Sequence, residues 1–262
     1  MTDRNLKVLL SCDDGLRSEG TAALAAELSG MAVLRACAPE EHSSGAGHAV
    51  TLRDPIRAAP AELEGCEGAW AVAGTPADSV KLALTELWPG WADLVVSGVN
   101  SGPNVGVNVF YSGTVGAAAE GAVLGTSAVA VSVDISERFD FREAAARSRP
   151  VIEELAGLIP FPPGVFFNVN VPAAGTTPRG VRLTRHGLSG FREYYRPCGE
   201  PGPDGSRRWE IHGDFHASDP DETWDAPALS AGLISVTPMV LDLTADGLRQ
   251  PEARGGNGLE RL

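Results

Sequence analysis

The feature that most constrains this chain is a stretch rich in glycine and asparagine, residues 97–121, which directly follows the apolar run 94–96. The apolar run predicts a buried strand, and the alanine-rich end of the stretch predicts a helix. Ser112, Gly113 and Thr114 lie where that helix should begin, and helix N-termini bind anions, phosphate above all. The stretch therefore predicts a phosphate site. The alternative is a glycine-rich connection that packs closely on a neighbouring element.

A pair of carboxylates, Asp13 and Asp14, follows a second predicted strand, residues 6–10. Loops at the carboxyl ends of parallel strands line a common crevice, so these aspartates are expected to face the predicted phosphate site. Two carboxylates would repel a phosphate unless a cation lay between them, and Mg²⁺ or Mn²⁺ suits oxygen ligands. Taken alone, Asp-Asp-Gly is also common as an acidic turn.

The alternation of strands and helices over residues 6–133 predicts an α/β fold, a doubly wound (Rossmann-like) and mostly parallel sheet. The predicted strands are 6–10, 32–37, 70–74, 93–97, 128–133, 166–171 and 233–243, with hairpins expected from residue 181 onwards. The predicted helices are 21–28, 76–87, 115–124 and 141–158. We divide the chain into an α/β core (1–135), its continuation (136–178), a C-terminal extension (179–245) and a flexible tail (246–262). Residues 197–220, rich in Gly, Pro, Asp and Arg, predict an exposed excursion.

The composition limits the classes of molecule that this chain can have as its main binding partner. The formal net charge of −13 argues against a nucleic-acid polymer or an anionic membrane as the main partner. It allows a small phosphorylated substrate, because a bound metal reverses the local charge. The four cysteines form no metal or disulfide spacing, and we see no signal peptide or membrane span, so we expect a cytoplasmic protein.

Other residues near the predicted crevice are less informative. The loop 38–47 should leave the second strand at the same edge as the aspartates, so Ser43 or Ser44 can bring an oxygen to a metal; the alternative is a solvated loop. None of the five histidines has paired metal-ligand spacing, which predicts surface or hydrogen-bonding roles, with His48 the mild exception beside the serines. The sequence lacks a Walker A loop, a G-x-G-x-x-G after the first strand and a G-x-S-x-G elbow.

Six motifs together resemble the SurE (stationary-phase survival protein) family of metal-dependent 5′/3′-nucleotidases. They run in order from Val8 to Ala245 and read VLLSCDDG, APEEHSSGAGHAVTL, AGTPADSVKLAL, VVSGVNSGPNVGVNVFYSGTVGAAAEGAVLG, FNVNVP and SVTPMVLDLTA. The pairing of DDG with the long SGVN…YSGT segment is highly specific.

The resemblance implies roles for particular residues. It implies one divalent cation (Mg²⁺ or Mn²⁺) per subunit, held by Asp13, Asp14, Ser44 and Asn100. It implies phosphate contacts from Asn104, Ser112, Gly113 and Thr114, with Asp13 and Asp14 as the catalytic residues. It also implies a protruding β-hairpin in the extension that supports a homodimer or homotetramer.

The chain departs from the family pattern in four places. Cys12 stands where asparagine is usual, and a thiol cannot replace an amide's donor and acceptor. Val107 and Asn108 replace an acidic pair, Trp224 replaces a threonine, and residues 192–221 align poorly. Three functions stay open: a phosphatase of nucleoside 5′- (and 3′-) monophosphates, a phosphatase of a non-nucleotide metabolite, and a non-catalytic phosphate-binding protein.

Overall fold

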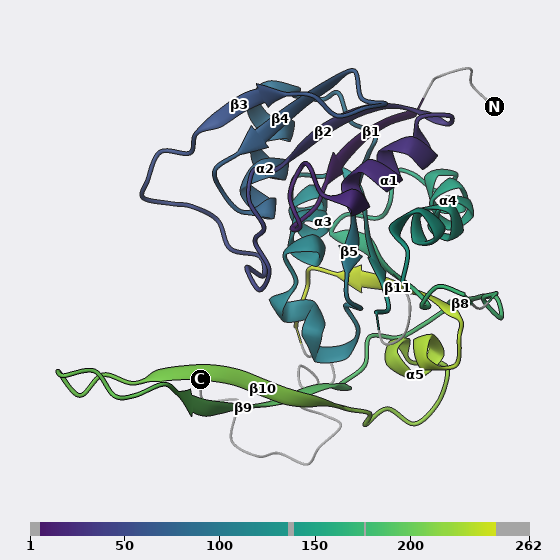
Figure 1. The fold of residues 1–262 in the computed structure, drawn as a ribbon. Coiled ribbons are helices and arrows are strands. Elements are labelled where there is room, and N and C mark those ends of the chain that lie inside the picture. The colour runs from purple at the N-terminus through teal and green to yellow at the C-terminus, as the bar shows by residue number, and fades with distance from the viewer. Residues whose placement is uncertain (1–5, 136–138, 176, 245–262) are drawn as a thin grey trace, which may run out of the picture.

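A nine-stranded sheet with helices on both faces forms the body of the computed structural model, which describes residues 6–135, 139–175 and 177–244 (Figure 1). The strand order is β3-β4-β2-β1-β5-β6-β7-β11-β8. A two-stranded hairpin, β9 and β10, projects away from this body (Figure 1). The predicted α/β fold with a C-terminal hairpin is therefore confirmed, and the predicted tail 246–262 lies outside the described residues.

The elements keep the order that the alternation predicts. The strands are β1 (Leu6–Ser11), β2 (Ala32–Pro39), β3 (Ala58–Ala61), β4 (Gly68–Val72), β5 (Leu94–Ser101), β6 (Ser127–Val133), β7 (Val165–Val171), β8 (Val181–Leu183), β9 (Gly190–Cys198), β10 (Arg208–His216) and β11 (Ile234–Val240). The helices are α1 (Glu19–Leu28), α2 (Pro76–Leu82) with its π-helical continuation η1 (Ala83–Leu87), the 3₁₀ turn η2 (Gly106–Tyr111), α3 (Gly113–Val123), α4 (Phe141–Ala156) and α5 (Asp225–Ser230).

Local chemistry explains where the helices begin. Ser18, Thr75, Ser112 and Asp140 cap α1, α2, α3 and α4, each accepting a hydrogen bond from a first-turn N–H. Thr75 also forms a capping box with Asp78.

Sequence reasoning missed β3, η2 and α5, and it ended β5 at residue 97, whereas the strand continues to Ser101 through an irregularity in its register with β6.

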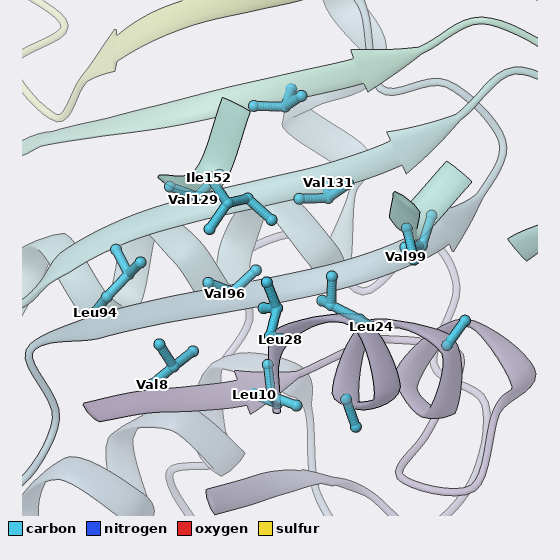
Figure 2. Packing of buried hydrophobic residues seen from close by; sticks show 14 of the residues in the cluster. Val8, Leu10, Leu24, Leu28, Leu94, Val96, Val99, Val129, Val131 and Ile152 are labelled. Atoms are coloured by element: carbon cyan, nitrogen blue, oxygen red, sulfur yellow. The ribbon is translucent and has the colours of Figure 1, made fainter. Parts of the chain in front are cut away.

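The core lies on both sides of the sheet. On one face Val8, Val96 and Val129 pack with Leu24 of α1 and Ile152 of α4 (Figure 2). The other face is covered by α2 and by the alanine-rich α3, whose small side chains let that helix lie close to the strands. Because both faces of these strands are buried, their residues are mostly apolar, as is usual for parallel strands, and the polar ones gather near their carboxyl ends.

The order of the central strands positions the site. β1 pairs in parallel with β2 on one side and β5 on the other, and β5 pairs in parallel with β6. The carboxyl ends of these strands therefore share one edge, and the chain reverses its winding direction beside β1. Ligands of doubly wound folds bind at such a switch point.

A loop at residues 186–189 ties the base of the hairpin to η2. Buried Asp225 accepts hydrogen bonds from the backbone N–H groups of Gly106 (2.9 Å) and Gly187 (3.1 Å). Asp219 accepts from the N–H groups of Leu188 and Ser189, both at 2.9 Å. These carboxylates satisfy donors that would otherwise be costly to bury, so the loop has a defined conformation.

Within the described residues, no helix has the length and apolar character needed to cross a membrane.

Candidate functional site

The acidic turn after β1 contacts both neighbouring strand ends. The N–H of Ser43, in the loop after β2, donates to the carbonyl oxygen of Asp13 (2.8 Å). The N–H of Ser101, at the end of β5, donates to Asp14 Oδ2 (3.2 Å). The adjacent Asn100 Nδ2 donates to the Gly102 carbonyl (2.7 Å), which orients the amide and leaves its oxygen as the acceptor for a cation. The structure thus places the predicted ligands Asp13, Asp14 and Asn100 at one edge.

Asp13 is pressed against the first turn of α3. The Thr114 hydroxyl donates to Asp13 Oδ1, and both residues are buried. A Cβ atom on Gly113 would lie 2.9 Å from Asp13 Cβ and 3.0 Å from Pro76 Cγ, so this position requires glycine. Burial raises the pKa of the Asp13 carboxyl, the Thr114 hydroxyl acts in the opposite direction, and the charge of Asp14 raises it further.

Residues 112–114, the predicted phosphate-binding turn, carry two kinds of polar group, side-chain hydroxyls and backbone N–H groups. Ser112 Oγ accepts from the Val115 N–H (3.1 Å) as the cap of α3, and the Thr114 hydroxyl is used by Asp13. Both hydroxyls therefore already have protein partners, while the predicted phosphate contacts of these residues stay predictions. The backbone N–H of Gly113 belongs to the first helical turn, where such groups have no partner within the helix. It remains a donor for an anion, next to the carboxylates.

Ser44 joins the acidic turn through His42, for which the sequence predicted a surface or hydrogen-bonding role without indicating its partners. His42 Nδ1 lies 3.0 Å from Asp14 Oδ1, and His42 Nε2 lies 2.7 Å from Ser44 Oγ. The imidazole is largely exposed, but both of its nitrogens are engaged. It therefore links two predicted metal ligands and fixes the Ser44 hydroxyl near the aspartates. The only sequence signal for this role is the position of His42 two residues before Ser44.

The loop that carries Ser44 is docked on α3. A Cβ atom on Gly116 would lie 2.3 Å from the Gly47 carbonyl oxygen, so the loop backbone crosses the helix in contact with it. The Gly47 N–H donates to the Tyr111 carbonyl (3.0 Å). His48 Nε2 lies 2.7 Å from Glu120 Oε2 on the same helix. The sequence set His48 apart from the other histidines because it lies beside Ser43 and Ser44. In the structure His48 ties this loop to α3.

Glu120 is the buried centre of that tether. Its second carboxylate oxygen lies 2.5 Å from Lys81 Nζ of α2. Burial by itself raises the pKa of Glu120, but the contacts with His48 and Lys81 outweigh it, so the net pKa is lowered. The ionised form therefore stabilises the docked loop.

Asn104 occupies a separate asparagine cluster. Its Nδ2 donates to Ser132 Oγ (2.8 Å), and its backbone N–H donates to Asn170 Oδ1 (2.8 Å). Its carbonyl accepts from Asn168 Nδ2 (2.7 Å). In the part of the chain that the structure describes, no hydrogen bond joins Asn104 to Asp13 or to the 112–114 turn. Its phosphate-binding role stays a prediction.

The residues at this edge fit a hard divalent cation. Ligand atoms of Cys12, Asp13 and Asp14 all lie within 4.8 Å of one another. Mg²⁺ and Mn²⁺ prefer oxygen ligands, and the carboxylates of Asp13 and Asp14 supply them, while Ser44 and Asn100 stay predicted ligands. The Cys12 thiol does not fit, because burial, followed by the charges of Asp13 and Asp14, raises its pKa and keeps it protonated.

Two buried hydroxyls lie beneath the same edge. Ser11 of β1 and Ser97 of β5 are register partners and are fully buried. Among the described residues, neither hydroxyl has a hydrogen-bond partner. Unpaired buried polar atoms are rare in proteins, and each calls for an explanation such as a catalytic role or a bound water or ion.

A cavity of about 860 Å³ between α1 and the start of α4 contains none of the predicted site residues.

The fold and the site together define an α/β protein in which an acidic turn lies against a helix N-terminus at the carboxyl edge of a parallel sheet. The profile of the family "Survival protein SurE" matches residues 8–193. The chain is 37% identical to the 5′-nucleotidase SurE of Syntrophomonas wolfei, over 91% of this chain and 90% of that one. It is 40% identical to the 5′-nucleotidase SurE of Syntrophobacter fumaroxidans, over 91% and 95%.

A solved structure agrees with these relatives. The crystal structure of the SurE protein from Aquifex aeolicus matches with a TM-score of 0.78 and 32% identity, over 92% of this chain and 96% of that one. The chain belongs to the SurE family. The resemblance found in the motifs is thereby confirmed, while the roles of individual site residues stay predictions.

Gly116→Ala tests the docking of the Ser44 loop. The new methyl group would collide with the Gly47 backbone, so the loop must move and carry Ser44 with it. We expect the affinity for Mn²⁺, measured by titration calorimetry, to fall about 10-fold or more, the usual cost of losing support around metal ligands. Gly30→Ala is the matched control, because a Cβ atom there meets nothing within 4 Å. Unchanged Mn²⁺ affinity in Gly116→Ala would contradict the docking role.

Glu120→Gln tests the tether by its pH dependence. The folded pKa of Glu120 is lowered, so its stabilising effect is present above the ordinary value of 4.5 and is lost as the pH falls through the folded pKa. We expect the wild-type protein to melt at a higher temperature than Glu120→Gln at pH 6, and the difference to shrink as the pH falls below 4.5. Thermal unfolding at intervals of about 1 pH unit measures this difference in melting temperature. If the difference stays constant from pH 6 to below pH 4.5, the charge of Glu120 has no such role.

Proposed function

We propose that this chain is a metal-dependent phosphomonoesterase that hydrolyses nucleoside 5′- (and 3′-) monophosphates to nucleoside and phosphate. The observation that carries the proposal is the contact of the acidic turn with the first turn of α3, through Asp13, Gly113 and Thr114. A carboxylate pair for a cation and a helix N-terminus for an anion lie side by side there. The relatives that carry the name 5′-nucleotidase SurE support the same activity.

Asp13, Asp14, Ser44 and Asn100 would hold one divalent cation, Mg²⁺ or Mn²⁺, per subunit. When bound, such an ion supplies Lewis-acid polarisation of a phosphate oxygen and lowers the pKa of a water molecule. The structure contributes the orientation of its ligands: His42 links Asp14 to Ser44, and the Ser101 N–H holds Asp14. These contacts restrict the ligands before the ion arrives, which lowers the entropic cost of binding.

The helix end positions the phosphate. The Gly113 N–H and the N-terminal partial charge of α3 would bind its oxygens and stabilise the charge that grows on them in the transition state. Asn104 is the proposed additional contact. One aspartate, Asp13 by preference, would accept the proton of the attacking water. Positioning and electrostatic stabilisation of this kind are most of what phosphoryl transfer requires from a protein.

The other two functions differ in substrate or in chemistry. A metabolite phosphatase is favoured by Cys12 and by residues 192–221, which depart from the family pattern. A panel of nucleotides, sugar phosphates and other metabolite phosphates distinguishes it from a nucleotidase. Metal-dependent release of phosphate from any small ester excludes the alternative of a non-catalytic phosphate-binding protein.

The cytoplasmic location of the protein stays a prediction.

Asp14→Asn tests the catalytic assignment. The amide keeps the size of the side chain but loses the charge that a divalent cation needs, so we expect kcat/KM for AMP to fall at least about 100-fold. Asp14 is only partly buried, so the variant should fold, which circular dichroism and thermal unfolding will show. Asp54→Asn, at an exposed position in the next loop, is the control and should keep full activity. Near-normal turnover by Asp14→Asn with Mn²⁺ bound would overturn the assignment.

We further propose that the hairpin β9–β10 joins copies of this chain into a homodimer or homotetramer. The register pairs Phe191 with Phe215, Tyr195 with Ile211 and Pro197 with Trp209. Directly paired residues of antiparallel strands lie on the same face, and side chains alternate between faces. One face of the hairpin therefore carries five large apolar side chains, interrupted by the Glu193–Gly213 pair, and these side chains are 41% to 66% exposed. Apolar surface of this extent is typical of an interface.

Ile211→Glu tests this interface, because a carboxylate in the middle of the apolar face would have to be buried on association. We expect light scattering coupled to size exclusion to show an oligomer for the wild type and a monomer for Ile211→Glu. His212→Glu adds the same side chain on the opposite face and should leave the mass unchanged. The proposal fails if the wild type is monomeric or if both variants have the same mass.

A further inference from the structure

Three polar side chains are completely buried on the α3 face of the sheet, beside apolar residues. Asn168 and Asn170 of β7 and Ser132 of β6 have no exposed surface. Because side chains alternate along a strand, they continue the face that Phe166 and Ala130 present to the core around α3. Burying a polar side chain costs free energy unless it forms hydrogen bonds. Packing of the core alone therefore does not account for these three residues.

The segment that follows β5 uses these side chains as backbone partners. The Asn104 N–H donates to Asn170 Oδ1 (2.8 Å), and Asn170 Nδ2 donates to the Asn104 carbonyl (3.2 Å). Asn168 Nδ2 donates to the same carbonyl (2.7 Å). An asparagine side chain carries the donor and the acceptor of a peptide group. Asn170 therefore takes the place that a neighbouring strand would have, and it satisfies backbone groups that are buried at Asn104.

The side-chain amide of Asn104 is oriented by the same group of residues. Asn104 Nδ2 donates to Ser132 Oγ (2.8 Å), and Ser132 is the register partner of Asn170. An amide nitrogen carries two hydrogens. Within the described residues this nitrogen makes no other hydrogen bond, so its second N–H can donate to an anion.

The part of the segment next to the proposed metal ligand Asn100 is held separately. The Gly102 N–H donates to the Val133 carbonyl (3.1 Å), and the Gly102 carbonyl accepts from Asn100 Nδ2 (2.7 Å). Neither bond involves a side chain of β7. The contacts of Asn104 can therefore be changed while Asn100 keeps its orientation.

We infer that Asn170 and Ser132 are positioning residues of the phosphate site, which act on the phosphate of the substrate through Asn104. This inference rests on the proposed phosphatase function and on the proposed phosphate contact of Asn104. Asn170 fixes the backbone of Asn104, and Ser132 fixes the direction of its amide. Both are fully buried, so neither touches the substrate itself.

Competitive inhibition by inorganic phosphate tests this inference, because phosphate uses the anion contacts without undergoing the reaction. We expect Asn170→Leu, which keeps most of the volume but loses the polar groups, to raise the inhibition constant Ki at least about 10-fold, since displaced binding groups lose much of their effect. Ser132→Ala, a smaller change, should raise Ki in the same direction. The affinity for Mn²⁺, measured by titration calorimetry, should stay unchanged in both variants.

A double-mutant cycle shows whether the effect passes through Asn104. We expect Asn104→Ala to raise Ki by itself, and Asn170→Leu or Ser132→Ala to add nothing in that background, because no amide remains to be positioned. Thr237→Val is the matched control. Thr237 is fully buried and pairs with Asn168 in the sheet, but it hydrogen-bonds Thr184 (2.8 Å). This variant should melt at a lower temperature and keep the Ki of the wild type.

Different results separate this inference from the proposed function. If the wild type with Mn²⁺ releases no phosphate from AMP, the phosphatase function fails and the inference fails with it. If the wild type is active but Ki is unchanged in Asn104→Ala or in both positioning variants, the function stands and the inference is overturned. Additive effects in the double variants, or a parallel loss of Mn²⁺ affinity, would show a general structural role and also overturn it. If Asn170→Leu does not fold, Ser132→Ala decides by the same criteria.

Discussion

The contact between the acidic turn and the N-terminus of α3 is the interaction on which the site depends. A carboxylate as buried as Asp13 is costly unless its charge is compensated. The Thr114 hydroxyl and the positive end of α3 offset part of that cost. The contact is possible because β1 and β5 are parallel neighbours and because Gly113 has no side chain. The residues proposed to hold the cation and those proposed to bind the phosphate are thereby brought to one place.

The loop after β2 is the second constraint, because it carries Ser44, the proposed further oxygen ligand, and joins it to Asp14 through His42. It is held by backbone contact at Gly116 and by the ionic chain Lys81–Glu120–His48. The chain has only two lysines, and one of them serves this purpose. Metal sites commonly rely on such supporting contacts as much as on the ligands themselves. His42, between Asp14 and Ser44, belongs to the same support.

The molecule separates the proposed chemistry from the proposed assembly. The site lies on the rigid edge of the sheet, whereas the hairpin carries an apolar face away from it (Figure 1). The family profile ends at residue 193, within the first strand of the hairpin, and the pairwise matches continue over most of the chain. Variation in the hairpin can therefore change contacts between subunits while the carboxylates and the helix end stay in place.

The sequence by itself determined the features that depend on neighbours along the chain. Apolar runs and their spacing predicted most strands, the predicted helix 76–87 begins at the same residue as α2, and the DDG and SGT motifs were expected to face each other, as the contact of Asp13 with Thr114 confirms. It missed β3, whose residues have low strand propensity, and the short α5. Only the tertiary structure decided which polar groups meet: Thr114 with Asp13, 101 residues apart, and His48 with Glu120, 72 apart. Short-range signals carry no information about such pairs, because their geometry arises only when the sheet and its helices pack.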